Sequence, residues 1–191
     1  MVGGVSRPSL AVWRSLVAAL ALVTAGCVTL TPEQQDRVTE VRRLADATTA
    51  AYDVQRVRVT VEPTNRLGIG ARYRQGNFYL NVRMLGSVHL DVVVAHELAH
   101  YLLGHDTLPT GVVTHSDWQR AQEQRELDAN AKAVEILTRV RGMTEAEAVR
   151  AMVAYLRAAQ QAVDRGSPVA AGHRQPVEEI ADLLARFPGR H

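Results

Sequence analysis

The residues best placed to do chemistry in this chain are His96-Glu97-Leu98-Ala99-His100. If this run is helical, His96 and His100 lie on one face, one turn apart, so that their two imidazoles can bind a single metal ion. Glu97 then lies beside that face, within reach of a water molecule on the metal. The pattern H-E-x-x-H is typical of helices that bind Zn2+ and activate water for hydrolysis. The alternative interpretation is an amphipathic helix on which both histidines are merely polar.

The elements that must position these residues are predicted from hydrophobic periodicity, capping residues and turn residues. Helices are expected over about 31–51, 91–104, 116–141, 144–164 and 176–187. Strands are expected over 56–61, 67–74 and 77–84, with a tight turn at 75–77. Residues 105–115 and 165–175 contain Pro and Gly and are expected to be loops.

Two histidines do not complete a catalytic metal site, because catalytic zinc usually has three protein ligands and one open position. Two carboxylates can supply the third ligand. Glu126 follows His100 by 26 residues and lies on the next expected helix, where small residues permit close packing. Asp106 follows His100 by only six residues. His105 is expected at the surface just after a helix end, well off the face that His96 and His100 share.

The segment Glu126-Leu127-Asp128-Ala129-Asn130 resembles the second-helix motif of gluzincin peptidases. The closest likeness is to the CAAX-prenyl-protease and HtpX-type peptidases, which have E-x-x-A-D, and a second likeness is to the ImmA/IrrE type, which has E-x-x-A-N. The resemblance implies that Glu126 is the third Zn2+ ligand and that Asn130, in place of the usual Asp, supports the motif histidines. Asp106 instead resembles the third ligand of metzincins, although Leu103 occupies the position at which that family has Gly.

A second segment, Gly172–Ile180 (GHRQPVEEI), resembles the H-P-x-x-x-E-R-I stretch of the CAAX-protease and HtpX-type domains. The resemblance gives His173 the role of stabilising the transition state beside the metal. Two residues separate His173 from Pro176, and Glu179 stands where the family has Arg.

Together these likenesses imply an α+β, zincin-like fold, with a small antiparallel sheet packed on the motif helix and further long helices. An extended peptide can add to the edge of such a sheet, and residues 77–84 are the candidate edge strand. The implied activity is Zn2+-dependent hydrolysis of peptide bonds, with Glu97 as general base and His173 as a donor to the oxyanion. Two alternatives stay open: an inactive zincin-fold lipoprotein that serves as a binding or structural module, and a metzincin-like peptidase with Asp106 as third ligand.

Residues 1–26 have the features of an export signal: basic residues precede the apolar run Leu16–Val23, which is too short to span a bilayer comfortably. The small residues before Cys27 resemble the lipobox of bacterial lipoproteins, which implies that Cys27 is lipidated after cleavage. The expected organisation is a lipoprotein signal peptide over 1–26, an anchor and tether over 27–35, and a zinc metallopeptidase domain over 36–191. The expected location is the bacterial cell envelope, at the periplasmic face of an outer membrane or otherwise at the outer face of the cytoplasmic membrane.

Composition restricts the expected partners. The chain has 22 Lys+Arg and 20 Asp+Glu, and two of the arginines, Arg7 and Arg14, belong to the expected signal. The remaining charges balance, and with no basic tract and few aromatics the sequence argues against nucleic-acid binding. Cys27 is the only cysteine, so no disulfide forms within the chain. The expected partners are a peptide or protein substrate and, through Cys27, a membrane; no oligomeric state is indicated.

Overall fold

The computed structural model of the chain describes residues 29–62, 70–107, 111 and 114–189. The chain divides into two units, Met1–Thr31 and Pro32–His191. Of the first unit only residues 29–31 are described, and they form no regular structure; the predicted signal peptide and Cys27 lie outside the described residues. None of the described helices combines the length and the apolar character that a membrane span requires.

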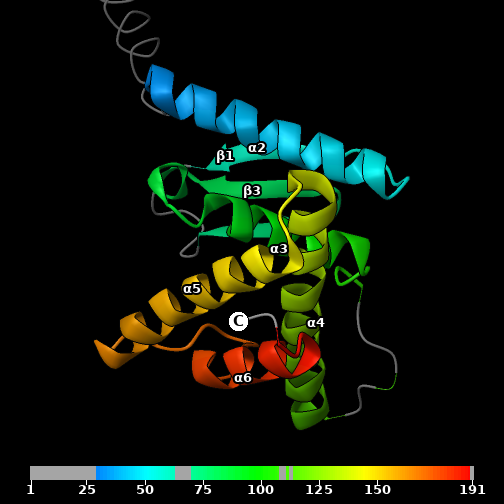
Figure 1. Cartoon of the computed structure of the whole chain (residues 1–191), viewed down its shortest axis with the longest axis vertical. Helices are drawn as coiled ribbons and strands as arrows, with labels where there is room; N and C mark the ends of the chain where they lie inside the picture. Colours follow the sequence, from blue (N-terminus) through cyan, green and yellow to red (C-terminus); the bar gives the residue numbers. More distant parts are fainter. Residues whose placement is uncertain (1–28, 63–69, 108–110, 112–113, 190–191) are drawn as a thin grey trace, which may run out of the picture. The chain divides into compact units, whose positions relative to one another are not determined.

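The second unit is an α+β arrangement of long helices and one small sheet (Figure 1). Its α-helices are α2 (Pro32–Ala51), α3 (Leu90–Leu102), α4 (His115–Arg141), α5 (Glu145–Asp164) and α6 (Pro176–Arg186). Its strands are β1 (Arg58–Glu62), β2 (Ala71–Arg74) and β3 (Asn77–Asn81), and the short 3-10 helix η2 (Val82–Gly86) follows β3. The α+β class and the order of the elements are as predicted.

The sheet is mixed, which corrects the expectation of an antiparallel sheet. Its strand order is β1-β3-β2, with β3 parallel to β1 and antiparallel to β2. A tight turn joins β2 to β3, and positive φ angles at Gln75 (48°) and Gly76 (77°) suit the two-residue turns that connect such hairpins. Strand β2 pairs along one edge of β3, and β1 pairs along the other.

Residues 77–84 are therefore not an edge strand, and that prediction is wrong. β3 is the central strand, and its Phe78 and Leu80 have no exposed surface. The strand also ends early, because the Asn81 side chain accepts a hydrogen bond from the backbone N–H of Arg83 and starts η2. The edge that faces α3 belongs to β2.

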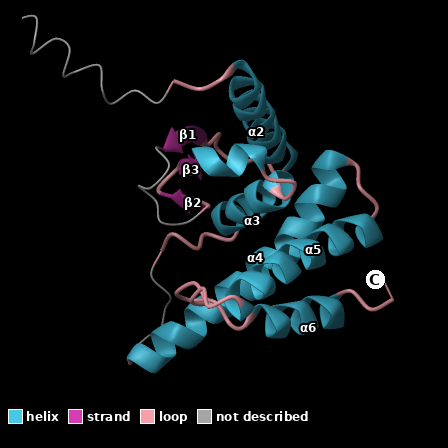
Figure 2. Ribbon diagram, turned by 90° about the vertical axis from the view of Figure 1, so that its left-hand side faces the viewer, coloured by secondary structure: helices cyan, strands magenta, loops and turns pink. Residues whose placement is uncertain are grey.

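Helix α3, which carries H-E-x-x-H, lies at the centre of the unit. It contacts α2 and β2 on one side and α4 and α5 on the other (Figure 2). Its sequence is apolar around almost the whole helix, and Val94, Ala95, Leu98 and Ala99 are completely buried. A helix that is apolar on all sides is stable only inside a core, so the motif lies in the interior of this unit.

Helix α4 packs most extensively on α3, and small residues make this approach possible. Ala129 and Ala133 have no exposed surface. Helix α4 begins at His115, after a capping box between Thr114 and Asp117. Helix α5 begins in the same way, after a capping box between Thr144 and Glu147.

Candidate metal centre

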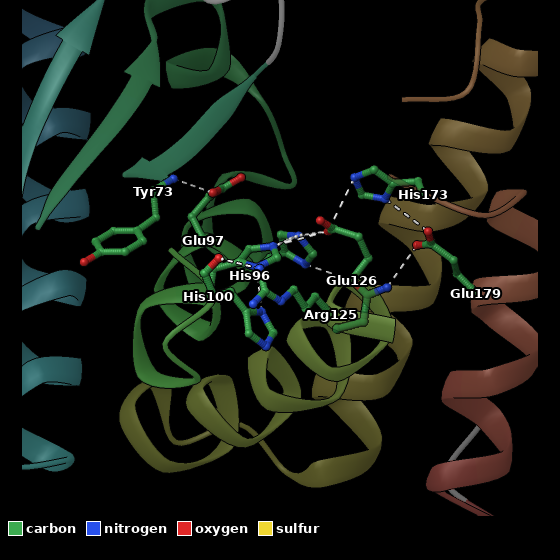
Figure 3. A network of polar contacts seen from close by, with 10 residues as sticks. Tyr73, His96, Glu97, His100, Arg125, Glu126, His173 and Glu179 are labelled. Carbon is green, nitrogen blue, oxygen red and sulfur yellow. Dashed lines mark hydrogen bonds and ion pairs between the residues drawn. The ribbon is translucent and has the colours of Figure 1, made fainter. Parts of the chain in front are cut away.

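Three side chains converge where α3 meets α4: His96, His100 and Glu126 (Figure 3). The Nε2 atoms of the two histidines are 3.1 Å apart, and Glu126 Oε2 is 3.1 Å from His96 Nε2 and 3.2 Å from His100 Nε2. Ligand atoms bound tetrahedrally at about 2.0–2.2 Å from one metal are about 3.3–3.6 Å apart, only slightly more than these distances. Among the described residues this is the one group of three potential ligands that can hold a metal ion.

The positions along the two helices explain the convergence. His96 and His100 are four residues apart on α3 and point to the same side. Glu126 and Asn130 are four residues apart on α4 and both point back at α3, on the face where Ala129 brings the two helices together. The site is therefore built by the packing of α3 on α4.

The proton on His96 is fixed by a hydrogen-bond chain that begins at Glu179. The Asn130 amide donates from Nδ2 to Glu179 Oε2 at 3.0 Å, so its oxygen must be the atom that faces His96. Asn130 Oδ1 is an acceptor and lies 2.9 Å from His96 Nδ1, so that nitrogen carries the hydrogen. The neutral ring then has a lone pair on Nε2, directed at His100 and Glu126.

His100 also has a hydrogen-bond partner on Nδ1, as His96 has in Asn130, and this partner was not predicted from the sequence. His105 was expected at the surface, but it is half-buried and its Nδ1 lies 2.9 Å from His100 Nδ1. Burial, together with the charges of His100 and Arg125, lowers the pKa of His105 to about 4, so it is neutral and has a nitrogen free to accept. When His100 donates from Nδ1 to His105, its Nε2 lone pair faces His96 and Glu126. Arg125 holds this segment by donating to the carbonyls of His105 (3.0 Å) and Thr107 (2.6 Å).

Two nitrogen lone pairs and a carboxylate oxygen at these distances repel one another unless a cation lies between them. In the metal-free protein a proton takes that place. Burial alone would lower the pKa of His96, but its hydrogen bond to Glu126 and the nearby carboxylate charges outweigh burial and raise that pKa to about 9. Burial would raise the pKa of Glu126, yet hydrogen bonds from His100 and His96 hold it far below its usual range. The donor set thus suits a metal cation, whose binding releases a proton.

His173 and Glu179 lie on the other side of the triad from Glu97 (Figure 3). His173 Nδ1 is 3.1 Å from Glu179 Oε1, and its Nε2 is 3.4 Å from Glu126 Oε2. Burial acts to lower the pKa of His173, but the hydrogen bond to Glu179 and the charges of Glu126 and Glu179 raise it above its usual value. The structure therefore brings His173 beside the carboxylate of Glu126, from a segment about 50 residues further along the chain.

Glu97 faces a cleft of about 500 Å3 that also exposes His96, Glu126 and His173. Its Oε2 accepts a hydrogen bond of 2.7 Å from the backbone N–H of Tyr73 in β2 (Figure 3). This contact places the carboxylate between the edge of the sheet and the triad.

Asp106, the competing third ligand, is not part of the group. It lies on the exposed turn after α3, whereas the Glu126 side chain is only 13% exposed. Helix α3 ends with Leu103 as its C-cap, and Gly104 (φ 66°) turns the chain away. The geometry of a helix end thus separates Asp106 from the face that His96 and His100 share.

Glu179 is a second residue whose role at this site was not predicted from the sequence. It is 2% exposed and touches both Asn130 and His173. An Asp at 130 would place two buried carboxylates about 3.0 Å apart, whereas the Asn amide donates to Glu179 and accepts from His96.

Comparison with known proteins adds no family to this geometry: no protein-family model, no curated protein and no solved structure matches the chain.

Replacing Glu126 by Ala should weaken zinc binding by more than about 100-fold, because loss of a ligand costs more than the 10–100-fold typical of its supporting partners. Asp106→Ala removes an exposed carboxylate that is not part of the triad and should change the affinity by less than about twofold. Competition with a chromogenic zinc chelator measures both. An equal loss of zinc affinity in the two variants would show that Glu126 is not the third ligand.

The contact between Asn130 and Glu179 predicts a coupled pair. Asn130→Asp alone should lower the free energy of unfolding by about 1–3 kcal/mol, because it buries a carboxylate beside Glu179. In the double variant with Glu179→Arg the two charges are opposite. Its free energy of unfolding should therefore be about 0.5–3 kcal/mol higher than the sum of the two single losses predicts. Denaturant unfolding of the metal-free variants measures the cycle. The same cycle with Glu123→Arg, on α4 but away from Asn130, should show no coupling; additive losses in the first cycle would contradict the pairing.

Proposed function

We propose that the protein is a zinc-dependent endopeptidase of the zincin type, anchored in the bacterial cell envelope by a lipid on Cys27. The observation that carries the proposal is the triangle of acceptor atoms on His96, His100 and Glu126, with edges of 3.1–3.2 Å. Two imidazoles and one carboxylate are a ligand set that suits zinc and leaves one position open for water. Glu97, next to His96 in the chain, supplies the base that such hydrolysis needs.

Zinc in this site would polarise the substrate carbonyl and lower the pKa of a bound water to about 7. Glu97 takes the proton from the attacking water and passes it to the leaving amine. The Tyr73 N–H holds Glu97 Oε2 at 2.7 Å and so orients the carboxylate, with Oε1 as the oxygen that carries the proton. Asn130 and His105 keep the two imidazoles turned with Nε2 towards the metal.

His173 is proposed to stabilise negative charge on the carbonyl oxygen in the transition state. Its raised pKa favours a protonated ring, which donates from Nε2 while Glu179 holds Nδ1. A donor that is already oriented gains more in a partly dry cleft than in water. Support for this role is the position of Nε2, 3.4 Å from Glu126 Oε2 and on the wall of the same cleft as Glu97.

The edge of β2 is proposed to bind the substrate backbone, in place of residues 77–84. The carbonyl of Gly70 accepts from Asn81 and so faces β3, whereas the N–H of Tyr73 points away from β3 to Glu97. Alternation along the antiparallel ladder places the N–H and C=O of Ala71 on this same outer side. Because Gly70, Ala71 and Arg72 line the cleft with Glu97, an extended peptide paired with β2 would cross the metal centre. Pairing with the substrate backbone suits a peptidase.

Glu97→Gln tests the activity. Gln keeps the size of the side chain and can still accept from Tyr73, so zinc content should be unchanged while hydrolysis falls by about 10²–10⁴-fold. Casein and a labelled peptide pool serve as substrates, with a chelator-treated sample as the control for metal dependence. Wild-type levels of cleavage in Glu97→Gln would remove Glu97 from the mechanism, and a zinc-loaded wild type that cleaves nothing would favour the inactive binding module.

Cys27→Ser tests the anchor. In a bacterial host fed labelled palmitate, the wild-type chain should carry the label and partition into detergent, and Cys27→Ser should do neither. Globomycin, which blocks the cleavage of lipoprotein signals, should cause the wild-type precursor to accumulate. Equal labelling of both chains would disprove lipidation at Cys27.

A further inference from the structure

A second cavity, here called the side pocket, lies next to the metal cleft. Its volume is about 200 Å3, and most of its wall comes from α5, from the segment that joins α5 to α6 and from the first turn of α6. Four residues belong to the walls of both the side pocket and the cleft: His96, Tyr155, Ala170 and His173. The side pocket therefore branches from the proposed reaction centre.

Most of the wall of the side pocket is apolar. Helix α5 contributes residues from one face, at helical spacing, and the joining segment closes the opposite side; these apolar residues are Leu156, Ala159, Ala162, Val163, Pro168 and Val169. Apart from the charged groups that belong to the metal centre, the wall contains no charged side chain. The apolar part of the wall offers van der Waals contact to a ligand, and the two charged groups at the other end, His173 and Glu179, already pair with each other at 3.1 Å.

The amide and the charged groups at the polar end of the side pocket are paired within the protein. Asn130 bonds to His96 at 2.9 Å and to Glu179 at 3.0 Å, and Glu179 bonds to His173 at 3.1 Å. The Tyr155 hydroxyl stays neutral, because burial and the nearby carboxylates raise its pKa to about 12. A charged ligand group would lose its hydration here and would have to compete with the pairs already formed, whereas an apolar group would not.

The volume selects among apolar groups. An engineered apolar cavity of about 150 Å3 in another protein binds benzene, so about 200 Å3 accommodates the side chain of Phe, Leu or Met. An Ala side chain would leave most of this space to water or empty.

We propose that the side pocket is the specificity site of the enzyme and takes a large apolar side chain of the substrate next to the bond that is cleaved. This inference rests on the proposed function, because it assumes that the cleft beside the side pocket binds a peptide. It defines the substrates as extended peptides with Phe, Leu or Met at that position, and it excludes Asp and Lys there.

The test compares zinc-loaded, full-length protein in detergent on peptides that differ only at one residue beside the cleavage site: Phe, Leu, Ala, Asp or Lys. The ratio of kcat/KM for the Phe peptide to that for the Ala peptide should be at least about tenfold, the lower limit for discrimination by a hydrophobic pocket. Ala159→Leu places a larger side chain on the wall of the side pocket and should lower this ratio at least about tenfold. Ala154→Leu makes the same change at an exposed position of α5 outside the side pocket and should leave the ratio unchanged.

A measurement without turnover separates the two proposals. N-acetyl-4-fluorophenylalanine amide should show a broadened 19F signal with the wild type and with Ala154→Leu, with or without zinc, and a sharp signal with Ala159→Leu. If no peptide is cleaved, the proposed function fails and the 19F signal alone decides the side pocket. If peptides are cleaved, an unchanged ratio in Ala159→Leu, a preference for Asp or Lys, or a sharp 19F signal with the wild type would overturn the inference.

Discussion

A buried carboxylate, Glu179, orients the side of the metal centre that lies on α3. It accepts from the Asn130 amide, which must then present its oxygen to His96 and keep a hydrogen on Nδ1. The same carboxylate holds His173 through Nδ1. One group thus determines which atoms of two histidines face Glu126. Inside a protein such a network is costly when a partner is missing, and Glu179, with 2% of its surface exposed, has both of its oxygens engaged.

The packing of α3 against α4 is what brings this network into existence. Alanines without exposed surface at positions 129 and 133 let the two helices approach closely enough for atoms on opposite helices to lie 3.1–3.2 Å apart. Larger side chains at the same positions would separate the helices and the ligands with them, since a packed interface gives way by moving its backbones. The apolar faces of α3 hold it in place from every side, which leaves the two histidines and Glu97 as its main polar groups.

The two flanks of the metal centre differ in chemistry, and this difference gives the site a direction. On one flank Glu97 is held by the backbone of β2, whose outer edge offers hydrogen bonds to another extended chain. On the other flank His173 and Tyr155 border a pocket with an apolar wall. The proposed peptidase function would need both: recognition of the substrate backbone on one flank and recognition of a substrate side chain on the other.

The sequence alone determined the elements and the residues that face one another along a single helix. The spacing of His96 and His100 fixes their shared face by helix geometry, and the signals at Thr144 and Gly76 located a helix start and a turn, because those signals act within a few residues. Local signals do not specify which strand lies in the middle of a sheet, so the position of β3 between β1 and β2 came only from the tertiary structure.

The roles of Glu179 and His105 at the site also came only from the tertiary structure. The contact of Glu179 with Asn130 spans 49 residues, and the contact of His105 with His100 depends on how the chain turns after α3. Glu126, proposed from a motif likeness, lies beside the histidines only because α4 packs on α3, and that packing is decided by the burial of apolar surface along the whole of both helices.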